Sequence, residues 1–386
     1  MKPSDSLSAV QSLMLGFADR TGLSKPGQPP RRYLWTDAFA VCNFLELYRR
    51  TRTDMFRDLA LALIDQVHET LGRHRHDDVR RGWISGLDEK EGRRHPTAGG
   101  LRIGKALPER APGEAHIDRS EWDLDGQYFH YLTKWMHALH RAGQVTGNAD
   151  FHRFARELAQ TAHARFTYLP SWGGPKRMYW KMSIDLSRPL VTSMGQHDPL
   201  DGLITYYELG ANLSEEDPGP DLKAEIDELA SLCRNQDWTT DDPLGLGGLL
   251  ADACRVGRLT VKGAILDPEL LQEILSAALT GLGSFSRQSP FTLPSGHRLA
   301  FREFGLSIGL KAAGMLQEFL AESPLSGIGS IAWQLRGILG FAHFIRTIED
   351  FWLDPVNRRA GTWMEHRDIN EVMLATSLAP EGFLSV

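Results

Sequence analysis

The sequence contains little cysteine. Its 386 residues include three cysteines, Cys42, Cys233 and Cys254, and none of them belongs to a CxxC pair. A small, odd number of widely spaced cysteines is typical of a reduced protein, in which they behave as small apolar side chains. We therefore expect all three to be reduced and buried, and a cysteine nucleophile is disfavoured.

Long apolar runs are also missing. The first ten residues, MKPSDSLSAV, lack the apolar core of a secretory signal, and no run reaches the roughly 18 residues that a membrane helix needs. The chain carries 43 Lys and Arg against 49 Asp and Glu, a net charge of −6, so no basic excess favours nucleic acid. We expect a cytoplasmic protein whose partners include neither nucleic acid nor membrane. The sequence leaves the oligomeric state open.

Motifs for cofactors and metals are scarce. A phosphate-binding glycine loop of the P-loop type is absent. The best metal candidate is HRHDD at 74–78, which fits the exposed end of a helix better than a metal site. We therefore expect no cofactor and no metal.

Helical periodicity, in contrast, is abundant and comes in two kinds. The segments 56–71 and 222–233 carry an apolar stripe on one face, whereas 38–45, 243–251 and 304–315 are apolar on nearly every side. A helix without a polar face must be covered all round. The alternation therefore predicts inner helices packed within a layer of amphipathic outer helices.

Twelve helices are predicted, and the even-numbered ones are the more buried kind. Links after the inner helices are short, whereas most links before them are long, so the long loops 74–123 and 169–198 gather at the end where the inner helices begin. Long loops on one face of a scaffold often carry function. We expect a single domain over 1–386. The predicted helices are 6–19, 36–52, 54–73, 124–146, 148–168, 199–213, 219–235, 243–257, 268–283, 299–321, 328–350 and 366–378.

One segment departs from the helical pattern. Apolar and polar residues alternate strictly over 178–187, which is the period of a β-strand. We expect it to form a small hairpin or ribbon in a mouth loop.

Acidic residues gather at the predicted starts of the inner helices. The usual role of Asp at such a position is to cap the helix. Asp125 and Asp201 lie further inside, where a simple cap is less natural, and we expect the acids to line one cleft. The candidate catalytic residues are Asp201, Asp125, Asp198, Asp37, Glu303 and His197.

Aromatic and basic residues accompany these acids. Flat apolar faces beside carboxylates suit a sugar ring, and cations suit an anionic substituent. Core packing explains the aromatics equally well, and a solvated loop surface explains the basic residues. The candidate substrate-binding residues are Trp35, Trp122, Tyr128, Trp172, Tyr179, Trp180, Lys181, Arg177, Trp238, Arg302 and Trp363.

Together, the twelve helices, the one-sided long loops and the acids and aromatics at inner-helix starts resemble the six-hairpin glycosidase-like superfamily. The resemblance covers nearly the whole chain and implies an all-α fold, an (α/α)6 barrel of six inner and six outer helices. The stretch RMYWKMSIDLSRPLVTSMGQHDPLDG at 177–202 looks like the signature of an uncharacterised family within it. No family-defining catalytic motif can be matched residue by residue.

Several functions are compatible with this resemblance, because fold alone does not settle function. The first is an inverting glycoside hydrolase, in which one carboxylic acid protonates the leaving oxygen and another carboxylate activates water. The second is a sugar epimerase or isomerase that uses His197 with His297 or His366 for proton transfer. A non-catalytic carbohydrate-binding or scaffold protein and another enzyme, such as a polysaccharide lyase, stay open.

For the hydrolase, the stretch HDPLD at 197–201 is the main candidate. Asp198 precedes Pro199 and is expected to cap the helix, whereas Asp201 lies about a turn further in. Burial would raise the pKa of Asp201 and suit it to general-acid work, while the more solvated Asp125 would act as the base. The sequence leaves these two roles interchangeable. We expect loop 74–123 to close the cleft into a pocket for a short soluble saccharide or glycoside.

Overall fold

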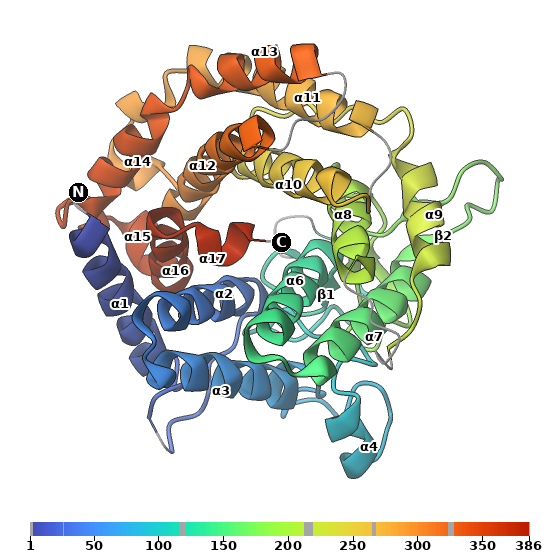
Figure 1. Ribbon diagram of the computed structural model, residues 1–386. Helices are drawn as coiled ribbons and strands as arrows, with labels where there is room; N and C mark the ends of the chain where they lie inside the picture. Colours follow the sequence, from blue (N-terminus) through green and yellow to red (C-terminus); the bar gives the residue numbers. More distant parts are fainter. Residues whose placement is uncertain are drawn as a thin grey trace. The chain divides into compact units, whose positions relative to one another are not determined.

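The computed structural model describes residues 3–25, 27–115, 117, 121–211, 219–264, 268–322 and 328–385. The chain forms two compact units. Unit 1 comprises Met1–Phe17 and Asn235–Val386, and unit 2 comprises Ala18–Arg234. Helices dominate both units, and the colours of Figure 1 follow them along the chain.

In unit 2, three inner helices pack in sequence, each backed by the outer helix that follows it (Figure 1). The first inner helix buries every residue from Leu34 to Leu47, whereas its outer partner buries one face. This is the burial that their apolar patterns predict. The inner helices are α2 (Leu34–Thr51), α6 (Phe129–Thr146) and α8 (Asp198–Gly210). The outer helices are α3 (Asp54–Leu71), α7 (Ala149–Phe166) and α9 (Lys223–Cys233).

Unit 1 repeats this arrangement of inner and outer helices. Its inner helices are α10 (Pro243–Val261), α12 (Ala300–Glu322) and α16 (Arg367–Leu378). Its outer helices are α11 (Pro268–Arg287), α13 (Ile328–Leu339) and α14 (His343–Leu353), together with most of α1 (Pro3–Arg20). The hydroxyl of Ser6 on α1 donates to the carbonyl of Leu378, 3.2 Å away at the end of α16.

Glycines set the distance between α10 and α12. A Cβ added to Gly247 would lie 2.0 Å from the carbonyl oxygen of Gly305, and one added to Gly309 would lie 2.6 Å from the Cα of Gly247. The two backbones therefore approach each other more closely than any side chain would allow.

Short elements decorate the units. The short helices are α4 (Glu89–Arg94), α15 (Gly361–Glu365) and α17 (Glu381–Leu384), with 3-10 turns η1 (Pro290–Thr292), η2 (Ser295–His297) and η3 (Asn357–Arg359). In unit 2, β1 (Gln127–Tyr128), β4 (Lys181–Met182) and β5 (Pro189–Val191) form an antiparallel sheet in the order β1-β4-β5. A second pair joins β2 (Thr167–Tyr168) to β3 (Arg177–Met178), with Thr167 opposite Met178.

The fold class expected from the sequence, all-α with alternating inner and outer helices and a small β-ribbon, is confirmed. Two details differ. The predicted strand 178–187 is broken, because β3 ends at Met178 and pairs with β2, whereas β4 begins at Lys181 and pairs with β1. The predicted helix 328–350 is divided by a turn at 340–342. The expectation of a single domain stays a prediction.

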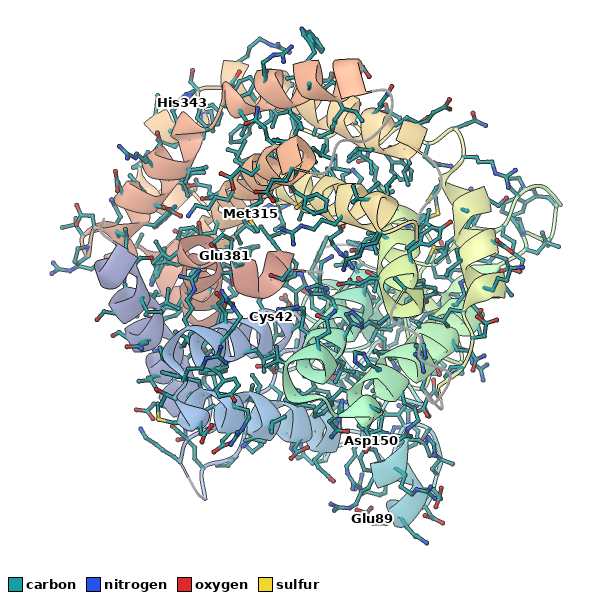
Figure 2. The ribbon with its side chains drawn as sticks, in the orientation of Figure 1. Cys42, Glu89, Asp150, Met315, His343 and Glu381 are labelled. Carbon is teal, nitrogen blue, oxygen red and sulfur yellow. The ribbon has the colours of Figure 1, made fainter. Side chains whose placement is uncertain are left out.

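The three cysteines are buried and free, as expected. Figure 2 shows Cys42 among the side chains of inner helix α2, whereas Asp150 and Glu89 lie at the outer edge of unit 2. Burial raises the pKa of the Cys42 and Cys233 thiols to about 12, so neither is a ready nucleophile. None of the helices among the described residues is both long and apolar enough to cross a membrane.

Candidate functional site

The candidate site lies where α6 and α8 begin in unit 2. Strand β1 runs directly into α6, so Tyr128, His130 and Tyr131 follow one another at this junction. Because Tyr128 lies opposite Lys181 in the sheet, the neighbouring Trp180 is brought to the same place. Helix α8 packs on α6 and adds Asp198 at its first turn.

An aromatic cluster surrounds His130. The ring centroids of Trp180, Tyr128 and Tyr131 lie 6.2, 5.2 and 4.9 Å from that of His130, and Trp180 is nearly parallel to it. Trp122 meets Trp180 edge-on at 4.8 Å and is 54% exposed. The cluster thus presents open aromatic surface next to a titratable ring, which suits the C–H face of a sugar.

His130 and Asp198 face each other across α6 and α8. The Nδ1 of His130 lies 3.6 Å from the Oδ1 of Asp198. Among the described residues, this Nδ1 and the Oδ2 of Asp198 are buried without a hydrogen-bond partner. The His130 side chain as a whole is 28% exposed, although its Nδ1 is buried. A small rotation would give the hydrogen bond by which a carboxylate orients a catalytic histidine.

Asp201 is held by α6. Its Oδ1 accepts from the Nζ of Lys134 at 2.5 Å, and its Oδ2 accepts from the hydroxyl of Thr133. The carboxylate is mostly buried and ion-paired. Both oxygens are therefore engaged before any substrate binds.

Two tyrosines join their hydroxyls beside the cluster. The hydroxyl oxygens of Tyr33 and Tyr131 lie 2.6 Å apart, and their rings meet edge to face. Burial raises the pKa of Tyr131 well above its ordinary value, so Tyr131 stays protonated at neutral pH. The ammonium of Lys105 lies 5.3 Å from the centre of the Tyr33 ring.

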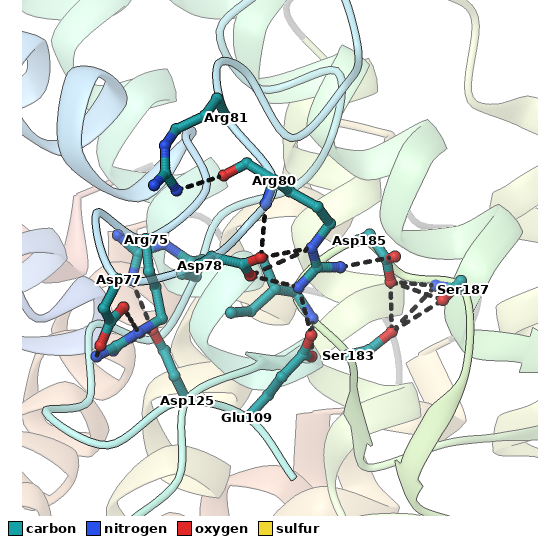
Figure 3. Close-up of polar contacts among 12 residues, drawn as sticks. Arg75, Asp77, Asp78, Arg80, Arg81, Glu109, Asp125, Ser183, Asp185 and Ser187 are labelled. Carbon is teal, nitrogen blue, oxygen red and sulfur yellow. Dashed lines mark hydrogen bonds and ion pairs between the residues drawn. The ribbon is translucent and has the colours of Figure 1, made fainter. Parts of the chain in front are cut away.

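Asp125 is fully buried, in contrast to the solvated position expected from the sequence (Figure 3). Its Oδ2 lies 2.6 Å from Arg102 and 3.3 Å from Arg75, and its Oδ1 accepts from the backbone N–H of Gly104 at 3.0 Å and of Lys105 at 3.3 Å. Two guanidinium groups and two backbone amides thus contact the two carboxylate oxygens. These contacts give Asp125 a structural role.

A second charge network fastens loop 74–123 to the sheet (Figure 3). The guanidinium of Arg80 bonds Asp78 at 2.6 Å, Glu109 at 2.7 Å and Asp185 at 2.9 Å. Asp185 also accepts from the hydroxyls of Ser183 and Ser187, between β4 and β5. One arginine therefore joins three segments that are distant in sequence.

Asp37, Trp35 and Lys181 are also fixed inside unit 2. Asp37 accepts from the backbone N–H of Tyr33 at 2.9 Å, at the start of α2, and lies 3.5 Å from Arg32. Trp35 is buried against Phe39. The buried Nζ of Lys181 donates to the carboxylate and the carbonyl of Glu121 and to the carbonyl of Leu124. These contacts support roles in packing and capping.

The other predicted residues of unit 2 are more exposed. Tyr179 stacks on Tyr168 at 4.0 Å beside the β2-β3 pair, Trp172 in the connecting loop is 77% exposed, and Arg177 is exposed. His197 is half-buried at the N-cap position of α8. Of this group, His197 is the one adjacent in sequence to Asp198.

Four predicted residues belong to unit 1. The carboxylate of Glu303 accepts two hydrogen bonds from Arg298 and one from the indole of Trp352. Arg302 pairs with Asp242 at 2.7 Å, Trp238 is buried, and Trp363 stacks on Trp352. Each of the four thus has a packing or pairing partner within unit 1, or is buried there.

The candidate residues named from the sequence leave out four residues of this site: His130, Lys134, Tyr33 and Lys105. Nothing in QYFHY shows that Asp198 faces His130 from another helix. The available signal was its position directly after Tyr128 at the start of an inner helix. Among the described residues, no three His, Cys, Asp or Glu side chains are arranged to hold a metal ion.

No protein-family model matches the chain, and no curated protein matches it. Solved structures do resemble it. A sugar epimerase from a ruminal bacterium has 10% identity over 88% of this chain and 86% of its own, with a TM-score of 0.49. Cellobiose 2-epimerase from Bacillus thermoamylovorans has 11% identity over 88% and 87%, with a TM-score of 0.47. Cellobiose 2-epimerase from Spirochaeta thermophila has 13% identity over 89% and 98%, with a TM-score of 0.45. At this level of likeness, the chemistry of the chain has to be inferred from its own residues.

Proposed function

We propose that the protein is a sugar epimerase or isomerase in which His130 moves a proton and Asp198 orients it. The observation that carries this proposal is the approach of the His130 Nδ1 to the Asp198 carboxylate at 3.6 Å, with the Nδ1 buried and the His130 side chain 28% exposed. A carboxylate at Nδ1 fixes the tautomer that leaves Nε2 as the base.

The reaction that fits a single base beside an aromatic platform is proton abstraction next to a carbonyl. His130 would take the proton from the carbon adjacent to the carbonyl of a ring-opened sugar, leaving an enediolate. Return of a proton to the same carbon from the other face gives the epimer, and return to the neighbouring carbon gives the isomer. We assign this second proton transfer to His197, the titratable residue that directly precedes Asp198 in the sequence.

The aromatic residues support a carbohydrate substrate. Trp122 and Trp180 offer a partly open apolar surface next to His130, and the hydroxyls of Tyr33 and Tyr131 can bond sugar hydroxyls. Sites of this kind combine apolar walls with a few placed polar groups.

The contacts of the acidic residues give less support to the glycoside hydrolase hypothesis. An inverting hydrolase needs two available carboxyl groups, one of them with room for a water molecule. Asp125 is enclosed by two arginines, Asp201 is paired with Lys134, and Glu303 is held by Arg298. Asp198 is the acid whose contacts leave it best placed to act on another group.

Solvent hydrogen exchange tests the proposal directly. Glucose, mannose, glucose 6-phosphate and glucuronate would be incubated with the protein in D2O, and loss of the C2 proton signal would be followed by NMR. We expect exchange with at least one of these sugars, and a fall of about 10²- to 10⁴-fold for His130→Gln, the usual contribution of a general base. Asp198→Asn should lower the rate less and change its pH profile.

The matched control is His76→Gln, because His76 is an exposed histidine of the same unit. It should exchange at the wild-type rate. Two results together would contradict the epimerase and favour the hydrolase. The wild type would show no hydrogen exchange at C2 of any of the sugars, and the His130→Gln variant would still release sugar from a nitrophenyl glycoside.

A further inference from the structure

We propose that the substrate of this site is an anionic sugar, carrying a carboxylate or phosphate group, and that Lys105 binds this group. The inference rests on the proposed function and adds a substrate class to it. It comes from comparing Lys105 with the other cations that surround the site.

Four neighbouring cations have carboxylate partners. Arg75 and Arg102 flank the buried carboxylate of Asp125. Arg110 and Lys181 each lie 3.0 Å from the carboxylate of Glu121. These charges are used by the fold and are not available to a ligand.

Lys105 is fixed at its backbone but not at its ammonium group. Its N–H donates to the Oδ1 of Asp125 at 3.3 Å, which places the residue beside the buried anion. Within the described part of the chain, no hydrogen bond or ion pair engages its Nζ, and the residue is only half-buried. Its one marked contact is the face of Tyr33, 5.3 Å from the ring centre. The aromatic ring holds the cation in place without neutralising it.

Contacts connect this ammonium to the proposed base. The hydroxyl of Tyr33 lies 2.6 Å from that of Tyr131, and the ring of Tyr131 lies 4.9 Å from the ring of His130. From the other side, the Nζ of Lys181 lies 5.3 Å from the ring of Tyr128, which also contacts His130. Burial lowers the pKa of Lys181, and the charge of Lys105 adds a smaller effect in the same direction, as expected of neighbouring cations.

A free ammonium at this position favours one kind of substituent. A carboxylate or phosphate would accept a charge-assisted hydrogen bond from Lys105, whereas a neutral hydroxymethyl group would not balance its charge. The site should therefore distinguish an anionic sugar from its neutral parent.

Calorimetric binding tests this without relying on turnover. Glucose, glucose 6-phosphate and glucuronate would be titrated into the full chain and into Lys105→Gln, Lys105→Arg and Lys90→Gln. Lys90 is the control, because it is an exposed lysine of α4 in the same unit. We expect at least one anionic sugar to bind the wild type about ten- to a hundredfold more tightly than glucose does. Lys105→Gln should remove this preference, Lys105→Arg should keep most of it, and Lys90→Gln should leave it unchanged.

The pattern of results identifies the anion and separates the two proposals. Preference for glucose 6-phosphate alone identifies a phosphate ester, and preference for glucuronate alone identifies a carboxylate. Equal affinity for glucose and both anionic sugars, binding of none of the three, or equal losses in Lys105→Gln and Lys90→Gln would overturn the inference. Hydrogen exchange on neutral sugars that is unchanged in Lys105→Gln would support the epimerase and reject the anionic substrate. Binding of an anionic sugar that depends on Lys105, without hydrogen exchange, would support the anionic ligand and reject the epimerase.

Discussion

Four aspartates at or near the starts of inner helices in unit 2 differ in what their carboxylates contact. Asp37 accepts from Tyr33, the N-cap residue of its own helix, Asp125 is enclosed by guanidinium groups, and Asp201 is bonded to α6. Asp198 faces the ring of His130. The same residue type therefore has four different roles, and only the last couples a carboxylate to a partly exposed base.

At the residue scale, we predict that Asp201→Asn destabilises the protein. The change leaves Lys134, a mostly buried cation, without its carboxylate, which should cost about 1–3 kcal/mol of unfolding free energy. Urea unfolding followed by circular dichroism measures this loss. The catalytic role that the sequence predicts for Asp201 implies, in contrast, little loss of stability on this substitution.

The control for this substitution is Asp58→Asn. Asp58 is exposed on α3 and pairs with a neighbouring arginine at the surface, so its loss should change stability by less than about 0.5 kcal/mol. Equal stability of Asp201→Asn and the wild type, with turnover lost, would instead favour the catalytic role.

The acids could be located from the sequence, but their partners could not. The pattern of buried and amphipathic segments places Asp125 and Asp201 near inner-helix starts, where the structure has them. Arg102 lies 23 residues from Asp125, and Lys134 lies 67 residues from Asp201. Which charge neutralises which depends on how loops and helices meet in three dimensions, and periodicity carries no information on that.

At the element scale, the contact between α10 and α12 gives a matched pair of substitutions. Gly247→Ala would place a methyl group 2.0 Å from the Gly305 carbonyl oxygen, so the helices must separate, at a cost of about 1–3 kcal/mol or more. Gly248→Ala meets nothing within 4 Å and should stabilise the helix by up to about 1 kcal/mol. Thermal melting of both variants should shift in opposite directions. A rise in the melting temperature of both variants would show that helix propensity, rather than packing, decides the outcome.

Helices α3 and α6 contain a pH-sensitive contact. Burial lowers the pKa of His68 to about 3, and its Nε2 accepts from the indole of Trp135. The unfolded chain takes up this proton near pH 6.5 and the folded chain does not, so stability is lost as pH falls below 6.5. The loss attributable to His68 should reach about 2 kcal/mol at pH 5.

The variant His68→Gln keeps an acceptor for Trp135 but cannot titrate. Its unfolding free energy should therefore fall less between pH 7.5 and pH 5 than that of the wild type, while the exposed His76→Gln should match the wild type. Identical pH dependence in all three proteins would mean that His68 is protonated in the folded state.

The elements themselves were largely predictable. The bounds of α3, α7 and α10 agree with the apolar pattern to within a few residues. Apolar residues recur with the helical period in a helix buried on one side, and they form a nearly continuous run in a helix buried all round. The predicted helix 124–146 begins late, at Phe129, because Gln127 and Tyr128 pair with β4 instead. Strand pairing between distant segments leaves no trace in local periodicity.

At the scale of the whole molecule, the sequence predicts a single domain. Differential scanning calorimetry should then show one transition whose calorimetric and van't Hoff enthalpies agree. Gly247→Ala in unit 1 and Asp201→Asn in unit 2 should both move that transition. Two transitions, each moved by one of the variants, would assign each compact unit its own unfolding.

The contacts of Arg80 affect how the chain can change in evolution. Its guanidinium bonds Glu109 across 29 residues and Asp185 across 105 residues. The entropy of closing a loop rises only slowly with length, by about 0.6 kcal/mol for each doubling. Related chains can therefore gain or lose residues in the exposed stretch 86–90 at little cost while the ends stay fastened. A lysine carries its three donors on one nitrogen and could not reproduce the planar fork with which Arg80 spans Asp78, Glu109 and Asp185, so we expect length to vary in this loop while the arginine stays.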